Sequence, residues 1–365
     1  MIGRRLLVAA AAAGAGWVAR AAWGTVPALG ASRSAIRPYA AGSPRYRDNR
    51  FHNSEPSSSL PSGSQSGLAK AFLTRGATGR PRRAIPLAAP LAPTAAGELA
   101  VTWLGHATAL IEIDGRRVLT DPVWSDRVSP SAVLGPARMH PMPMALEDLP
   151  TIDAVVVSHD HYDHLDQSTV VRLARTQSTI FVVPVGVGAH LRRWGVPADR
   201  VVELDWDEST EVAGLTLTCT EARHFSGRGL ARDTTLWASW VIAGPRRTVF
   251  FGGDSGYTTR FADIGRRYGP FDVTLLPVGA YDERWPDIHM NPEEAVRVHL
   301  DVDGGLLIPI HWATFNLAFH PWDEPITRLL DAAADAGVTM SVPMVGQRID
   351  GVRPPEQKPW WQGLA

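Results

Sequence analysis

The sequence has a single cysteine, Cys219, among 365 residues. One cysteine excludes a disulfide within the chain, and it also excludes a zinc site built from several thiolates. Cys219 lies in the strand-like segment LTLTCTEA, so we expect a small buried thiol in the core. Any metal ion must therefore be held by histidine and carboxylate side chains.

An excess of charge of one sign is also absent, because 36 Lys and Arg residues stand against 37 Asp and Glu residues. Proteins that bind nucleic acid through its phosphates carry a basic surface. The balanced charge therefore predicts no nucleic-acid partner.

A long apolar run is missing too. The N-terminal segment MIGRRLLVAAAAAGAGWVARAAWG is interrupted at Arg20, and its apolar part is shorter than the roughly 20 residues that span a bilayer. Its paired arginines and the small residues around Arg20 favour an export signal. We expect residues 1–30 to be a signal-like or membrane-anchor segment outside the fold, in a membrane-associated or exported protein. The alternatives are an Ala-rich amphipathic helix and a cytoplasmic location.

The composition divides the rest of the chain into three parts. Residues 31–96 form a Pro-, Ser- and Gly-rich N-terminal extension, in which NSEPSSSLPSGSQSG is typical of a loop or linker. Residues 97–350 form the expected catalytic domain, and residues 351–365 form a tail. Within the domain, DAVVVSH predicts a strand buried on both faces, and DQSTVVRLART and NPEEAVRVHLDV predict helices. Strands and helices alternate throughout, which predicts an α/β fold with large sheets.

Ligand-type side chains crowd the segment VVVSHDHYDHLDQ, directly after the apolar strand. His159, His161, Asp163 and His164 follow the pattern H-x-H-x-D-H. Neutral imidazole and carboxylate are the ligands of zinc and related divalent metals. Four such groups within six residues exceed what one catalytic metal with an open position needs. We therefore expect two metal ions that share this loop.

Three other predicted strands end in a residue of the same kind. His224 follows LTLTCTEA, Asp254 follows TVFFGG, and His311 follows LLIPI. Sites in layered α/β folds form where strand ends meet. The recurrence predicts that these three side chains join the loop in one site.

The segment SHDHYDH, together with His224, Asp254 and His311, resembles the metallo-β-lactamase superfamily. The resemblance implies an α/β fold of the αβ/βα type, a four-layer sandwich, with two Zn²⁺ ions at one edge. It also implies two ligand sets and one bridging ligand: His159, His161 and His224 on one zinc, Asp163, His164 and His311 on the other, and Asp254 between them.

The likeness is most extensive to the family of N-acylphosphatidylethanolamine-hydrolysing phospholipases D, from about Glu98 to Thr327. The motifs that carry it are TWLGHATALIEIDG, LTDPVWSDRVSP, FFGGDSGY, PVGAYDERW, NPEEAVRVH and IPIHWATF. The resemblance implies a zinc-dependent phosphodiesterase that releases N-acylethanolamine and phosphatidic acid. It also implies a phospholipid substrate, contact with a membrane surface and a possible homodimer.

Two other functions stay open. Bacterial ascorbate-phosphate lactonases share GHA and H-x-H-x-D-H, which leaves a metal-dependent hydrolase of a small soluble substrate, such as a lactone or sugar phosphate. A non-catalytic metal-dependent sensor is the other alternative, and the full set of seven ligand-type residues argues against it.

The remaining expectations concern individual side chains. The catalytic residues are expected to be Asp163 and Asp254, with Asp254 steering the proton of the attacking hydroxide. The resemblance implies that His289 contacts the substrate and that His106 lies near the metals, where it would donate a hydrogen bond to a ligand. Tyr162 lies inside the metal loop and is expected to face the substrate, and Asp121 in LTDP is expected to bond a ligand histidine. A structural histidine at 106 and a turn cap at 121 are the alternatives.

Overall fold

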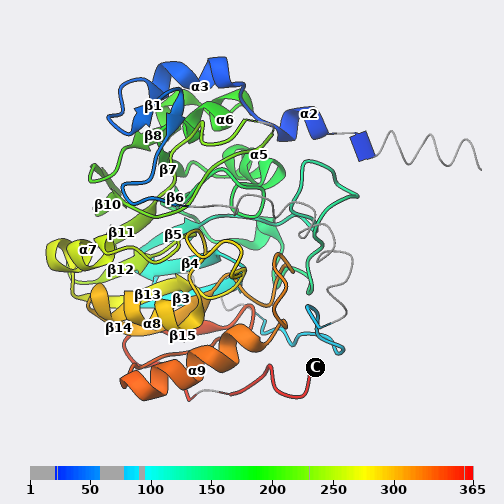
Figure 1. The fold of residues 1–365 in the computed structure, drawn as a ribbon, viewed down its shortest axis with the longest axis vertical. Coiled ribbons are helices and arrows are strands. Elements are labelled where there is room, and N and C mark those ends of the chain that lie inside the picture. The colour runs from blue at the N-terminus through cyan, green and yellow to red at the C-terminus, as the bar shows by residue number, and fades with distance from the viewer. Residues whose placement is uncertain are drawn as a thin grey trace, which may run out of the picture.

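Two β-sheets lie face to face between helices in the computed structural model, which describes residues 21–22, 24–57, 78–89, 95–229, 231–356 and 358–364 (Figure 1). The seven-stranded sheet has the order β15 (Arg348–Asp350), β3 (Leu99–Gly105), β4 (Thr108–Ile113), β5 (Arg116–Thr120), β6 (Ala154–Val156), β7 (Ile180–Pro184) and β8 (Val201–Leu204). The six-stranded sheet has the order β14 (Gly304–Ile310), β13 (Phe271–Pro277), β12 (Thr248–Phe251), β11 (Ser239–Ala243), β10 (Leu215–Thr220) and β9 (Ser209–Val212).

Helices cover the outer face of each sheet. The seven-stranded sheet carries α5 (Gln167–Thr176) and α6 (Val187–Arg193), and the six-stranded sheet carries α7 (Arg260–Tyr268), α8 (Pro292–Asp301) and α9 (Glu324–Ala336). Two short 3-10 helices, η1 (Leu146–Asp148) and η2 (Ala198–Arg200), complete these layers. In Figure 1, α6 lies above the strands, and α8 and α9 lie below them. The arrangement is the four-layer α/β sandwich that the sequence predicts.

The burial of β6 shows how one strand serves two layers. Ala154 and Val156 pack in the core between the sheets, whereas Val155 and Val157 pack against the helices of the outer layer. Because successive side chains of a strand point to opposite faces, all four positions must be apolar. The run DAVVV satisfies this requirement, and the prediction of a strand buried on both faces is confirmed.

The direction of the strands decides where the site lies. In the seven-stranded sheet β5, β6, β7 and β8 pair in parallel, and in the other sheet β12, β13 and β14 pair in parallel. β10 runs in the same direction as β12, because both are antiparallel to β11. The carboxyl ends of these strands therefore meet at one edge of the sandwich, which is where loops form sites in such folds.

The N-terminal extension contributes to the fold, which its composition did not predict. It contains α3 (Arg33–Ala40) and the hairpin of β1 (Tyr46–Arg47) and β2 (Arg50–Phe51). Ahead of it, α2 (Thr25–Ala28) belongs to the segment 1–30 that was expected to lie outside the fold, yet Ala28 is buried. Ile36, Ala40 and Phe51 are buried in the central core. Burying these apolar side chains against the sandwich removes them from water, which stabilises the attachment of the extension.

The expectations for residues 1–20 and 58–77, an export or anchor segment and most of the predicted linker, lie outside the described residues. Within the described part of the chain, no helix is long and apolar enough to cross a membrane.

Most predicted helices are confirmed. The pattern at residues 166–176 gives α5, and α8 begins at Pro292 with the Asn291–Glu294 capping box. The helix α9 ends at Gly337, whose φ of 68° is accessible to glycine without strain. Cys219 is fully buried in β10, as expected. The sequence did not predict α7, since its charged stretch RFADIGRRY shows only a narrow apolar stripe.

Candidate metal centre

Seven predicted ligand residues converge where the strands end. The metal loop, residues 157–166 between β6 and α5, supplies four of them. The loops after β10, β12 and β14 supply His224, Asp254 and His311. Five of the seven residues are buried, and His161 and Asp163 are partly exposed. The side chains of His159, His164 and His224 have no exposed surface. The convergence that the strand ends predict is thus present.

Three imidazoles form the first group. His159 Nε2 lies 2.7 Å from His161 Nδ1, and His224 Nε2 lies 3.4 Å from the same His161 atom. Burial, with the neighbouring imidazoles, holds the pKa of His159 well below its usual range, and burial does the same for His224. Both rings are therefore neutral, which is the form that binds a metal. This group could hold one metal ion.

The second group mixes imidazole and carboxylate. Asp163 Oδ2 lies 3.4 Å from His164 Nε2 and 3.5 Å from His311 Nε2. The ligand atoms of these three residues and of His106 lie close enough together to share one ion. A carboxylate beside two imidazoles is an ordinary donor set for a divalent metal.

Asp254 lies between the two groups. Its Oδ2 atom is 3.1 Å from His164 Nε2 and 3.1 Å from His311 Nε2, on the side of the second group. The same atom is 4.0 Å from His159 Nε2 and 3.9 Å from His224 Nε2, on the side of the first group. A single carboxylate thus faces both groups, which is the position of a bridging ligand.

Asp121 and Ser158 fix which nitrogen of two rings faces the cluster. Asp121 Oδ2 accepts a hydrogen bond from His164 Nδ1 at 2.7 Å and one from Ser158 Oγ at 2.6 Å. Ser158 Oγ in turn lies 2.9 Å from His159 Nδ1 and accepts its proton. With both Nδ1 atoms occupied, the Nε2 atoms of His159 and His164 are directed to the centre. The expected role of Asp121 fits this geometry, whereas Ser158 carries no motif that would have revealed it.

Backbone groups orient the ring of His224 and join the backbones of His106 and His311. His224 Nδ1 donates to the carbonyl of Ile288 at 2.7 Å, so its Nε2 faces the cluster. The backbone of His311 donates to the carbonyl of His106 at 2.9 Å, and both residues have positive φ angles, 62° and 54°. His106 Nε2 also lies 2.9 Å from Asp163 Oδ2. His106 therefore contacts Asp163, a proposed metal ligand, which fits the expected hydrogen bond to a ligand.

The charges and the unsatisfied atoms of the cluster fit a divalent metal. Burial opposes the charge of Asp254 and of Asp163, yet the neighbouring imidazoles hold the pKa of each carboxyl well below its usual range. Asp254 Oδ1 and His289 Nδ1 are buried and have no hydrogen-bond partner among the described residues. Buried polar atoms that lack partners are costly unless an ion or water satisfies them.

A comparison with known proteins identifies the family. Residues 116–312 match the family profile described as the beta-lactamase superfamily domain. The chain belongs to the beta-lactamase superfamily. An uncharacterised protein of Mycobacterium tuberculosis is 56% identical over 98% of both chains.

Two relatives carry the name of an activity. An N-acyl-phosphatidylethanolamine-hydrolyzing phospholipase D of Caenorhabditis elegans is 42% identical over 65% of this chain and 71% of its own length. A mitochondrial enzyme of that name from Saccharomyces cerevisiae is 33% identical over 62% of this chain and 50% of its own. Among solved structures, a metallo hydrolase of Ignicoccus hospitalis superposes with a TM-score of 0.53 at 20% identity, covering 69% of this chain and 97% of its own. That likeness concerns the fold.

Within this superfamily fold, Tyr162 takes a position that its sequence context did not reveal. Its hydroxyl donates to the carbonyl of Arg228, and its ring lies 4.2 Å from the Arg228 guanidinium carbon. The hydroxyl proton is thus already used, so the expected phosphate contact would require that bond to be exchanged.

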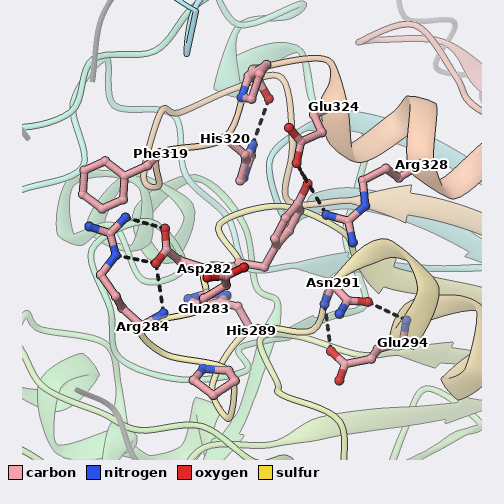
Figure 2. A pocket seen from close by; sticks show the side chains of 13 residues that line it. Asp282, Glu283, Arg284, His289, Asn291, Glu294, Phe319, His320, Glu324 and Arg328 are labelled. Carbon is pink, nitrogen blue, oxygen red and sulfur yellow. Dashed lines mark hydrogen bonds and ion pairs between the residues drawn. The ribbon is translucent and has the colours of Figure 1, made fainter. Parts of the chain in front are cut away.

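His289 lies between the metal centre and a large pocket. Its Nδ1 is 3.8 Å from Asp254 Oδ2, and burial lowers its pKa to about 4, so the ring is neutral. The pocket measures about 820 Å³ and is lined mainly by polar and charged side chains (Figure 2). Arg284 binds Asp282 through two nitrogens (Figure 2). The Tyr281 hydroxyl donates to Glu324 at 2.6 Å. This position is compatible with the substrate contact expected of His289.

Three apolar side chains, here termed the apolar rim, border the cluster, and one of them, Phe319, also lines the polar pocket. The ring of Phe225 lies 4.4 Å from that of His161 and 4.8 Å from that of His224. Phe225, Leu317 and Phe319 are all partly exposed and pack on one small apolar cluster. The proposed metal centre is therefore bordered by a polar pocket next to His289 and by an apolar rim next to His161 and His224.

Asp160 is the ligand-type residue of the motif that faces away from the cluster. Its Oδ2 lies 3.3 Å from His190 Nε2, and its Oδ1 accepts from the backbone of Gly227 at 2.7 Å. The sequence shows that Asp160 lies between His159 and His161, but it does not show that the loop turns the Asp160 side chain away from the cluster, toward His190.

Proposed function

We propose that this chain is a dizinc phosphodiesterase that hydrolyses N-acylphosphatidylethanolamine-type phospholipids to N-acylethanolamine and phosphatidic acid. The observation that carries the proposal is Asp254, whose carboxylate faces two separate groups of metal-type ligands. The names of the relatives from C. elegans and S. cerevisiae support the substrate, at 42% and 33% identity.

The proposed ligand sets follow the two groups. One zinc is assigned to His159, His161 and His224, the second to Asp163, His164 and His311, and Asp254 is the ligand common to both. Zinc ions held there would supply Lewis acidity and make a water acidic enough to react near neutral pH.

The proposed reaction consumes one water. Its oxygen forms a bond to phosphorus, and the bond between phosphorus and the N-acylethanolamine oxygen breaks, after which that oxygen takes up a proton. Asp254 stays ionised because His164 and His311 lower its pKa against the effect of burial, so Oδ1, which has no partner among the described residues, can accept a hydrogen bond from the water and orient it. Asp163, ionised for a similar reason, adds a second fixed negative charge beside His106.

The apolar rim supports a lipid substrate. Acyl chains require an apolar groove beside the polar centre, and Phe225, Leu317 and Phe319 provide apolar surface there. On the N-terminal segment, Val26 and Leu29 are 65% and 39% exposed, which suits contact with a membrane surface. A homodimer and the lack of a nucleic-acid partner stay predictions.

One observation favours a second candidate, hydrolysis of a small soluble substrate such as a lactone or sugar phosphate. The pocket beside His289 is large, at about 820 Å³, and polar and charged side chains line most of it. Charged walls suit a small polar molecule better than an acyl chain.

A single experiment separates the candidates. The purified full chain is analysed for zinc and then incubated with N-acylphosphatidylethanolamine vesicles, and in parallel with a soluble lactone and a sugar phosphate. Asp254→Asn is the inactive control, and Leu300→Ala, at a residue 55% exposed on α8, is the matched surface control. Release of N-acylethanolamine and phosphatidic acid by the unsubstituted chain and Leu300→Ala, but not by Asp254→Asn, supports the lipid reaction. Intact lipid with turnover of a soluble substrate supports the second candidate.

A further inference from the structure

A buried aspartate lies between two proposed ligands of the metal loop. Asp160 separates His159 from His161, and its side chain is 1% exposed. Its Oδ2 lies 3.3 Å from His190 Nε2, and its Oδ1 accepts a hydrogen bond from the backbone of Gly227 at 2.7 Å. Such a buried carboxyl group is costly unless neighbouring polar groups hold it, and those groups restrict the backbone that carries it.

Arg228 ties both halves of the metal loop from the same side. Its guanidinium donates to the carbonyl of Asp160 at 2.7 Å and to the carbonyl of Leu165 at 2.7 Å. The guanidinium is buried, and its carbon lies 4.2 Å from the ring of Tyr162 and 5.0 Å from that of Trp194. Arg228 thus fixes the loop immediately before His161 and immediately after His164.

Residues 27–31 of the N-terminal segment, here termed the N-terminal clasp, hold these groups from behind. Ala28 accepts a hydrogen bond from Arg228 Nε at 2.9 Å, and Ala31 donates from its backbone to His190 Nδ1 at 2.8 Å. That bond leaves the proton of His190 on Nε2, which faces Asp160. Gly30 approaches so closely that a Cβ atom there would lie 2.2 Å from His190 Nδ1.

We infer that Asp160, His190 and Arg228 are positioning residues for the metal loop, and that the N-terminal clasp sets the metal affinity of the centre through them. Loss of the clasp removes a partner from His190 and from Arg228, and the two then hold the loop backbone less tightly. Partners of this kind, one step removed from the metal, typically change metal affinity by about 10- to 100-fold. The inference rests on the proposed metal centre, but it does not depend on the proposed substrate.

Two glycines of the N-terminal segment provide a matched pair of variants. Gly30 and Gly24 both have positive φ angles, 76° and 80°, so alanine is strained at either position. An added Cβ at Gly30 would meet the His190 ring, whereas one at Gly24 would meet no atom of the described residues within 4 Å. The difference between Gly30→Ala and Gly24→Ala therefore isolates the clasp contact from backbone strain.

The test measures zinc affinity by competition with a chromophoric chelator, and hydrogen exchange of the amides of residues 159–165 in the metal-free full chain. We expect Gly30→Ala to weaken zinc binding by about tenfold and to speed exchange in the loop, with unchanged circular dichroism. Gly24→Ala should do neither. His190→Gln repeats the test without a backbone change, and Gly30→Ala combined with His190→Gln should be no weaker than the worse single variant.

Equal zinc affinity and equal loop exchange in Gly30→Ala, His190→Gln and Gly24→Ala would overturn the inference. This failure is distinct from failure of the proposed function. A chain that binds zinc and shows the clasp effect, yet leaves N-acylphosphatidylethanolamine intact, refutes only the substrate. A chain that hydrolyses the lipid without any clasp effect refutes only the inference.

Discussion

Asp121 Oδ2 accepts the Nδ1 proton of His164 across 2.7 Å, in a place where neither side chain has any exposed surface. The pair joins the end of β5 to the metal loop after β6. Since Asp121 also accepts from the backbone of Ser158 at 2.6 Å, one carboxylate fixes both the path of the loop and the tautomer of a proposed ligand.

Asp121→Asn tests this relationship. The amide keeps the size of the carboxylate but turns an NH₂ group toward a donor, either Ser158 or His164. We expect zinc affinity to fall by about 10- to 100-fold, with the fold retained. Asp148→Asn, at an exposed residue of η1, is the control. Zinc affinity equal in the two variants would show that Asp121 does not orient His164.

The two proposed ligand sets predict different losses of metal. His224→Ala should remove the ion of the first group and leave the second, and His311→Ala should do the reverse. Asp254→Asn should weaken both, because its carboxylate faces both groups. Elemental analysis of metal per chain checks this, with His52→Ala as the control. If His224→Ala and His311→Ala each lost every ion, the centre would be a single cooperative unit.

The protonation of the metal-free centre predicts that zinc binding depends on pH. Burial lowers the pKa of His311, but the carboxylates of Asp254 and Asp163 outweigh burial and raise the pKa to about 9. The same two carboxylates raise the pKa of His164 well above its usual range. Both rings hold a proton at pH 7, which zinc must displace. Zinc affinity should therefore increase from pH 6 to about pH 9.

Titration calorimetry in two buffers of different ionisation enthalpy counts the protons. At pH 7 we expect one proton to leave from each of His164 and His311 as the second ion binds. A binding enthalpy that is the same in both buffers would mean that the rings are already neutral.

Acid stability should depend on His140, which lies outside the metal ligands. Burial is the main cause that lowers its pKa to about 4, while the unfolded chain takes up the proton near 6.5. The unfolded state binds more protons between these values, so the free energy of unfolding falls as the pH falls through this window. The loss from this residue is about 2 kcal/mol between pH 6.5 and pH 5.

Chemical denaturation of the parent chain and of His140→Gln at both pH values measures this contribution to the free energy of unfolding. The variant should lose less stability on acidification than the parent chain does. His52→Gln, at a partly exposed histidine, is the comparison. Identical acid loss in His140→Gln and the parent chain would rule out His140 as the source.

Phe225 should distinguish a lipid from a small substrate. Phe225→Ala removes apolar surface beside His161, and the lost burial is worth roughly 2 kcal/mol to an acyl chain that contacts it. We expect KM for N-acylphosphatidylethanolamine to rise about tenfold or more, with kcat and zinc content little changed. Turnover of a small soluble phosphodiester should be unaffected. An equal loss for both substrates would place Phe225 in the support of the metal ligands instead.

The sequence by itself determined the class of fold and the ligand types. Alternating strand and helix patterns, the doubly buried run at residues 154–157 and the pattern from His159 to His164 are local features, because they depend on neighbours within a few residues. The rule that ligands follow parallel strands extended these features to His224, Asp254 and His311 without any coordinates.

Only the tertiary structure decided which way each side chain turns and what holds it. Asp160 and Asp163 are both acids of the same loop, yet one faces His190 and the other faces His106. The bond from Ala31 to His190 joins positions 159 residues apart, and no periodicity of the sequence records such a pair. These contacts are set by the packing of the sheets and the N-terminal clasp, since a hydrogen bond depends on distance and direction in space and not on separation along the chain.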